Sequence, residues 1–257
     1  MGEIETKFGI VAMVDALGAK NFTIEDSRNF IKHRDDLIEF IKGLSKKFLK
    51  GAIDIPDLDI ATFGDTIIIC WPIEDKKEIG ITLMGMFHQM KGLVLKGITE
   101  RYFYRGSIAV GDYIQYENTI LGPAISDAAG WYEKGNWFGI ILTPNCEFHA
   151  IQSIIEEKEY DEKINLVPIE SLIVKYPVPI ENCLKYRYSI SWPFDFLLPF
   201  CSPNTKMTPT SVFTGCMSDA YIAVGTEEKY YNSLAFFEWY RDEIFPKIKD
   251  ASVKLYL

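Results

Sequence analysis

Two apolar segments of the sequence each carry a single carboxylate at one edge. The segment FGIVAMVD ends at Asp15, and Asp65 lies inside IATFGDTIIICW. Continuous runs rich in Val and Ile are typical of strands that are buried on both faces. A carboxylate beside such runs is costly to desolvate unless it is paired or binds a cation. The two aspartates therefore indicate a metal site.

The composition excludes several classes of protein. The 257 residues are 48% hydrophobic, which is enough to bury a sizeable core, and the net charge of −9 argues against a broad nucleic-acid or anionic-membrane surface. Five widely spaced cysteines without a CxxC pair favour reduced thiols. The N-terminus is acidic, and no apolar run reaches the ~20 residues of a membrane helix. We expect a cytoplasmic protein without nucleic-acid or membrane partners.

Hydrophobic periodicity predicts alternating strands and helices in the first half of the chain. The expected elements are a strand at 8–15, a helix at 26–50, two strands joined at Gly64–Asp65, a helix at 75–97, a strand within 101–116, a helix from Pro123 to about Gly135, and a strand within 137–144. This βαββαβ start predicts an α+β, ferredoxin-like fold. The first strand and the hairpin are neighbours in that topology, so Asp15 and the Asp65 turn should share one edge of the sheet.

The second half of the chain is less regular. We expect strands at 171–176 and 184–192, a Pro-rich irregular stretch at 193–210 and a helix over about 227–249. The sequence contains no clear linker. We therefore divide the chain into a core at 1–145 and a segment at 146–257 that supplies the remaining strands and a C-terminal extension packed on the same domain.

Four motifs in the core occur in the order of a known family. They are VDALGAKNF, FGDTIII, YRGSIAVGD, and GPAISDAAGWYE followed by GIILTP. Over residues 8–145 the chain resembles the class III nucleotide cyclase catalytic domain, and more closely the bacterial Pycsar-type pyrimidine cyclases of antiphage signalling. The resemblance implies a head-to-tail homodimer with sites at the interface. It also implies conversion of a nucleoside triphosphate into a 3′,5′-cyclic nucleotide and pyrophosphate.

The resemblance also assigns the metal and phosphate sites. Asp15, Ala16 and Asp65 match the positions that bind two divalent cations, Mg²⁺ or Mn²⁺ in this chain. The phosphate-binding loop matches Leu17, Gly18, Ala19 and Lys20, and Gly18 would let the backbone approach the phosphates closely. In such an enzyme the cations neutralise phosphate charge and favour deprotonation of the ribose 3′-hydroxyl.

Two departures from the family pattern bear on turnover. The ribose-orienting asparagine is replaced by Ser126, which still donates a hydrogen bond, and the arginine one turn later is replaced by Gly130. Losing one charged donor to a phosphoryl transition state costs ~3–4 kcal/mol by analogy with an oxyanion hole. Four basic residues are candidate substitutes, namely Arg105, Lys134, Lys185 and Arg187. Lys185 and Arg187 alternate on a predicted strand and should share a face.

The base-reading positions leave the nucleotide open. They correspond to about Ala61 and Thr119, which match neither the residues of adenylyl cyclases nor those of guanylyl cyclases. An ATP or GTP preference is therefore not supported, and a pyrimidine nucleotide remains open. One alternative is a catalytically degenerate module that binds nucleotide or a partner protein. Another is a different two-metal phosphoryl-transfer enzyme on the same fold.

Overall fold

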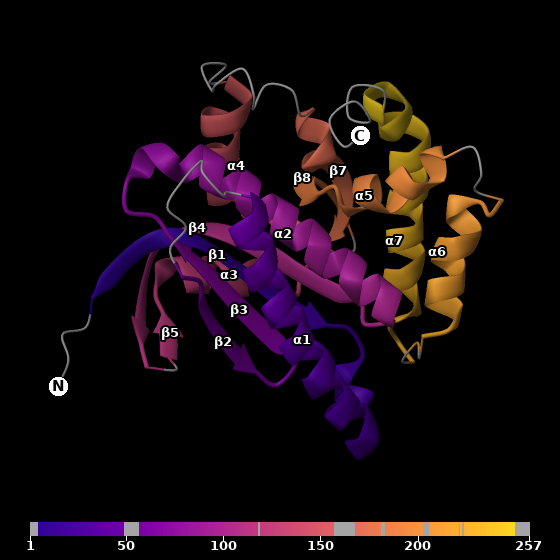
Figure 1. Ribbon diagram of the computed structural model, residues 1–257, viewed down its shortest axis with the longest axis horizontal. Helices are drawn as coiled ribbons and strands as arrows, with labels where there is room; N and C mark the ends of the chain where they lie inside the picture. The colour runs from indigo at the N-terminus through magenta and orange to yellow at the C-terminus, as the bar shows by residue number, and fades with distance from the viewer. Residues whose placement is uncertain are drawn as a thin grey trace.

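The fold is described from a computed structural model that covers residues 5–48, 57–117, 119–156, 168–180, 183–202, 206–220, 222 and 224–249. The first six elements follow the predicted order (Figure 1). They are β1 (Thr6–Ala16), α1 (Ile24–Phe48), β2 (Asp59–Phe63), β3 (Thr66–Pro72), α2 (Ile79–Glu100) and β4 (Tyr104–Tyr116). The α+β, ferredoxin-like start of the fold is therefore confirmed.

The strands form one mixed sheet in the order β2-β3-β1-β4-β6-β8-β7. β1 pairs antiparallel with both β3 and β4, as the ferredoxin-like topology requires. The later strands are β6 (Gly139–Leu142), which is parallel to β4, and the hairpin of β7 (Ile173–Ile180) and β8 (Cys183–Ile190). A short strand, β5 (Thr119–Leu121), pairs with the end of β4. The second half of the chain thus extends the sheet that the first half begins.

The central strand β1 is buried on both faces because its side chains alternate between two apolar clusters. Ile10, Ala12 and Val14 belong to the larger cluster, to which α1 and α2 contribute, and Val11 belongs to a smaller one. Helix α3 (Pro123–Trp131) covers that smaller cluster from the other face. This is the period-two arrangement expected of a strand between two layers.

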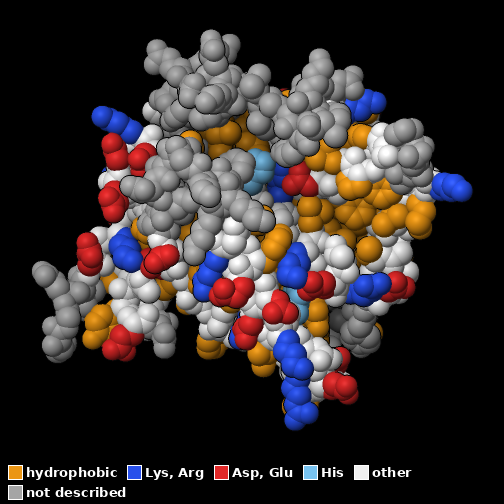
Figure 2. All heavy atoms as spheres, viewed as in Figure 1, with side chains coloured by type: hydrophobic (Ala, Val, Ile, Leu, Met, Phe, Trp, Pro, Cys, Tyr) orange, Lys and Arg blue, Asp and Glu red, His pale blue; other side chains and the backbone are white. Residues whose placement is uncertain are grey.

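Helices also pack on the far end of the sheet, beside β7 and β8 (Figure 1). They are α5 (Trp192–Leu197), α6 (Pro209–Ser218) and α7 (Glu227–Trp239), while α4 (Pro144–Ala150) follows β6. Helix α7 continues through a π-helical turn at Tyr240–Ile244. On the side shown in Figure 2, acidic and basic side chains intermingle over the surface of α1.

Three details of the sequence prediction were wrong. The stretch 193–210 is not irregular throughout, because α5 lies in it and α6 begins at its end. The third helix ends at Trp131, before Gly135. Strand β7 continues past residue 176 through Pro177 and Pro179. Prolines interrupt a central strand but are tolerated at an edge, and β7 is the last strand of the sheet.

Candidate functional site

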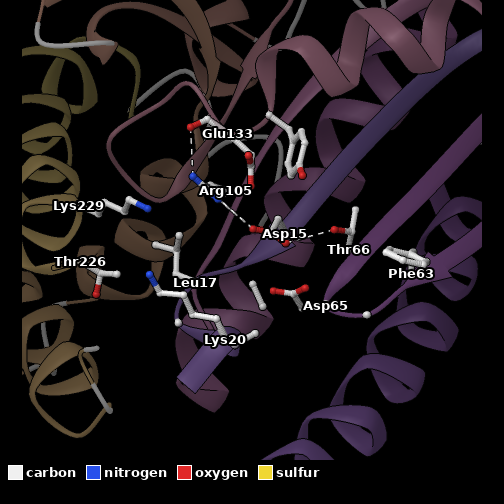
Figure 3. A pocket seen from close by; sticks show the side chains of 15 residues that line it. Asp15, Leu17, Lys20, Phe63, Asp65, Thr66, Arg105, Glu133, Thr226 and Lys229 are labelled. Carbon is white, nitrogen blue, oxygen red and sulfur yellow. Dashed lines mark hydrogen bonds and ion pairs between the residues drawn. The ribbon is translucent and has the colours of Figure 1, made fainter. Parts of the chain in front are cut away.

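A cavity of about 360 Å³ opens at the sheet edge where β1 ends, and it faces the start of α7 (Figure 3). Its lining comes from five parts of the chain, namely the end of β1 with the loop that follows, the β2–β3 turn, β4, the residues after α3, and α7. The lining residues are Asp15, Ala16, Leu17, Gly18, Ala19, Lys20, Phe63, Gly64, Asp65, Thr66, Arg105, Tyr132, Glu133, Thr226 and Lys229. The cavity therefore collects both predicted aspartates and the whole predicted phosphate loop.

Asp15 lies at the end of β1 and is only 7% exposed. Its Oδ1 accepts a hydrogen bond from Thr66 Oγ1 at 3.2 Å, and its Oδ2 pairs with Arg105 Nη2 at 3.2 Å. Burial, followed by the negative charge of Asp65, raises the pKa of Asp15, and the Arg105 guanidinium partly opposes this shift. An added cation would relieve the repulsion between the two carboxylates.

Asp65 occupies the second position of the two-residue turn between β2 and β3. Gly64 precedes it with φ of 60°, a left-handed conformation that glycine adopts without strain. Asp15 is in register with Thr66, the residue after the turn, so the turn lies at the end of β1. The predicted adjacency of the first strand and the hairpin is thus confirmed, and the aspartates line one cavity.

The loop after β1 turns sharply at Gly18, whose φ is 85°. A short 3₁₀ turn at Ala19–Asn21 follows, and the first N–H groups of such a turn have no partner within it. The Leu17 N–H donates to the Phe103 carbonyl at 2.8 Å. That hydrogen bond ties the loop to the start of β4, and it engages one of the N–H groups predicted to bind phosphate.

Arg105 reaches the cavity from β4 because it is the cross-strand partner of Asp15. Besides Asp15, it binds Glu133 through Oε1 at 2.9 Å and through the backbone carbonyl at 3.1 Å. The sequence pointed to Arg105 only as one of several possible basic substitutes. Its pairing with Asp15 became visible only once the register of β1 and β4 was known.

Two lining residues come from the C-terminal segment, and no sequence pattern predicted them. Thr226 is the residue before α7, and Lys229 lies in the first turn of that helix. Burial is the main reason why the pKa of Lys229 is lowered, and the charges of Arg105 and Lys20 lower it further. No motif marks these positions, which lie more than two hundred residues after Asp15 in the chain.

Five residues predicted for the site lie outside this cavity of a single chain. Ala61 is in β2 and packs toward the smaller apolar cluster, while Ser126 is exposed on α3. Thr119, in β5, pairs with the C-terminal end of β4, whereas Arg105 lies near the start of that strand. Arg187 pairs with Glu147 at 3.3 Å and lies over the Trp131 ring, and Lys185 is on the same strand, β8.

The described residues contain neither a ready-made cluster of metal ligands nor a helix suited to crossing a membrane. No cluster of three or more His, Cys, Asp or Glu side chains in that part of the chain has the geometry of a metal site. None of its helices combines the length and the apolar character that crossing a membrane requires.

Comparison with known proteins finds similarity in structure only. No protein-family model and no curated protein sequence matches the chain. The adenylyl cyclase CyaB from P. aeruginosa has a TM-score of 0.43 and 12% identity, with 74% of this chain and 96% of that chain covered. An adenylate/guanylate cyclase/hydrolase from Silicibacter pomeroyi has a TM-score of 0.42 and 14% identity, with 73% and 98% covered.

A third solved structure is the catalytic core of a rhodopsin-guanylyl cyclase with converted specificity, in complex with ATPalphaS. Its TM-score is 0.41 and its identity 10%, with 74% of this chain and 98% of that chain covered. Identities and TM-scores this low assign no activity to this chain.

Proposed function

We propose that this chain is a nucleotidyl cyclase that converts a nucleoside triphosphate into a 3′,5′-cyclic nucleotide and pyrophosphate. The observation that carries the proposal is the composition of this cavity, in which Asp15 and Asp65 lie with three cationic side chains. Those cations are Lys20, Arg105 and Lys229. The motif resemblance between residues 8 and 145 supports the same reaction independently of the geometry.

The donor set fits a hard divalent cation. Mg²⁺ is commonly bound through one or two carboxylates together with substrate phosphates, and it needs no closed cage of protein ligands. Asp15 and Asp65 supply two such carboxylates. Burial, and after it the repulsion from Asp65, raises the pKa of Asp15, and a cation would relieve that repulsion. Asp15, Asp65 and Ala16 would hold Mg²⁺ or Mn²⁺. When bound, these ions supply charge neutralisation and favour ionisation of the 3′-hydroxyl.

The other residues of the cavity have roles that follow from their chemistry. The turn at Gly18 and the N–H groups after it hold phosphate oxygens, and Lys20 neutralises phosphate charge at the loop. Arg105 presents a planar, permanently charged fork that suits a phosphoryl group. A cation held by Asp15 and Asp65 would supply the counter-charge that Arg105 now supplies to Asp15. Arg105 is then the candidate for the charge that Gly130 lacks.

The direct test is product formation from each of the four ribonucleoside triphosphates with Mn²⁺, read by mass spectrometry. We expect one nucleotide to give a cyclic monophosphate and pyrophosphate in equal amounts, and Asp65→Asn to lower the rate at least ~100-fold, the usual scale for losing one such electrostatic contact. Wild type that forms no cyclic product with any nucleotide would refute the activity.

We further propose a pyrimidine substrate and a role in antiviral signalling, and the same assay tests the base.

A head-to-tail homodimer completes the proposal, since Ser126 and Thr119 lie outside the cavity of their own chain. Mixing Asp65→Asn with Ser126→Ala protein should restore activity, because random exchange gives about a quarter of the sites with both residues intact. Mixing Asp65→Asn with Asp15→Asn is the matched control and should restore no activity.

We also propose that residues 1–145 and 146–257 form one domain, because β7 and β8 extend the sheet of β1.

A second candidate function is a nucleotide-binding module without turnover. It is favoured by Gly130, where a side chain would meet open space and where no charge is available. It is also favoured by Arg105, which Asp15 and Glu133 already neutralise. Nucleotide binding without product, with Asp65→Asn weakening that binding, would support this alternative.

A further inference from the structure

The C-terminal helix α7 places a cation in the cavity that the sequence motifs do not include. In Figure 3 the ammonium groups of Lys20 and Lys229 gather at the end of the cavity away from Asp65. Among the described residues, none forms an ion pair with Lys229. The cavity therefore has a carboxylate end, suited to cations, and a lysine end whose two ammonium groups form no ion pair with any described residue.

The position of Lys229 is fixed by contacts that continue from α7 into the site. One turn further along α7, Ser233 Oγ accepts from the Phe138 N–H at 2.8 Å, and Asn232 Nδ2 donates to the Asn136 carbonyl at 2.7 Å. Tyr230, next to Lys229, packs against the Phe103 ring with 5.2 Å between centroids. α7 is thus docked on the segment between α3 and β6 as well as on the start of β4.

The same residue, Phe103, joins α7 to the predicted phosphate loop. Its ring contacts Tyr230, and its carbonyl accepts the Leu17 N–H at 2.8 Å. Helix α7 and the loop after β1 therefore share one support, so that Lys229 and Lys20 are held toward the same space. Because these contacts anchor the helix that carries Lys229, ligand binding has to order only the lysine side chain and not its backbone.

The electrostatic surroundings of Lys229 identify the class of ligand. Burial lowers the pKa of Lys229 most, the positive charges of Arg105 and Lys20 lower it further, and the negative charges of Asp15 and Glu133 raise it. The acidic neighbour Glu228 is engaged by Asn136 Nδ2 at 2.8 Å. A cluster of cations that repel each other in a partly buried cavity is stabilised by an anion with several charges, such as a chain of phosphates.

We propose that Lys229 binds the phosphate chain of the nucleoside triphosphate, so that the C-terminal segment supplies a substrate-binding residue to the site of its own chain. This inference rests on the proposed function for the identity of the substrate. The contact itself requires only a polyphosphate. Residues 1–145 alone would then lack one of the cations that bind the substrate.

The test measures binding of inorganic tripolyphosphate, with Mn²⁺ at a fixed concentration, to the full chain by calorimetry. Lys229→Met should weaken binding ~10- to 100-fold, the range for losing one charge-assisted hydrogen bond. Lys229→Arg should stay within about threefold of wild type, because it keeps the charge. Lys247→Met is the matched control: it removes the same charge from an exposed position further along the same helical segment and should bind as wild type.

The stability of the ligand-free protein distinguishes a structural role of Lys229 from a role in binding phosphate. Lys229→Met removes a charge that other cations repel, so its melting temperature should equal or exceed that of wild type; a clear decrease would mean a structural role and would count against the inference. In the cyclase assay the same variant should raise KM for the nucleotide more than it lowers kcat. Wild type that binds no tripolyphosphate, or Lys229→Met that binds it as tightly as wild type, overturns the inference. Binding that depends on Lys229, without any cyclic product, refutes the cyclase proposal alone.

Discussion

Removing the Arg105 guanidinium tests whether the paired aspartates form a cation site. Arg105 Nη2 lies 3.2 Å from Asp15 Oδ2, and the two side chains are 14% and 11% exposed. At an effective dielectric constant of about 20 this attraction is worth about 5 kcal/mol before desolvation. The second pair, with Glu133, adds less than about 1 kcal/mol because the Glu133 side chain is 58% exposed.

We expect Arg105→Met to lower the free energy of unfolding by about 3 kcal/mol in metal-free buffer. Because the variant no longer has to desolvate the Arg105 guanidinium, part of the lost attraction is offset. Asp15, however, remains buried beside Asp65 without its counter-charge. For a chain of this size that loss corresponds to a decrease of ~6–12 °C in melting temperature. The measurement is a thermal melt of the chelator-treated protein.

Mn²⁺ should then stabilise the variant more than wild type. In wild type the ion has to displace Arg105 from Asp15, whereas in Arg105→Met the carboxylates are unpaired. A tenfold tighter dissociation constant would give ~1.4 kcal/mol more stabilisation at the same excess of Mn²⁺. The reasoning is refuted if Mn²⁺ stabilises both proteins equally, or if the variant and wild type have the same melting temperature in metal-free buffer. Arg101→Met breaks an exposed pair with Asp219 and is the control that should change neither result.

Three further predictions concern stability, measured by urea denaturation. Gly18→Ala places a side chain at φ of 85° and should cost ~1–2 kcal/mol. Lys91→Ala removes a fully buried ammonium that pairs with Asp195 and should cost ~3–5 kcal/mol. Burial lowers the pKa of the partly buried His88 from 6.5 to about 3, so the unfolded chain binds more protons between these values, and stability should fall as pH drops through that interval, by at most ~1.4 kcal/mol per pH unit. His88→Gln should flatten this decrease between pH 7 and pH 5.

The first half of the fold was predictable because its signals are local. The apolar run before Asp15 and the glycine turn before Asp65 each define a strand end within a few residues. The βαββαβ order then places those ends together, since crossover connections allow few alternatives. The two aspartates therefore came together in the structure as the sequence predicted.

The remainder of the site depends on contacts that no local pattern encodes. Arg105 could be named as a basic residue, but its partner followed only from the register of β1 against β4. Lys229 reaches the cavity because Tyr230 and Ser233 dock α7 on residues near 138. The strand expected at 171–176 continues through Pro177 and Pro179, and the edge position that tolerates these prolines is a property of the assembled sheet.

The formal charges that line the cavity cancel, and this constrains what the site can bind. Three carboxylates, from Asp15, Asp65 and Glu133, line the cavity together with three cations, from Lys20, Arg105 and Lys229. A phosphate chain alone would bring negative charge close to Asp15, and a metal ion alone would have to displace Arg105. A metal–triphosphate complex would satisfy both ends, since Asp15 and Asp65 would hold the ion while Arg105 and the two lysines would face the phosphates. Metal and nucleotide should therefore bind with positive coupling, each raising the affinity for the other by the same factor.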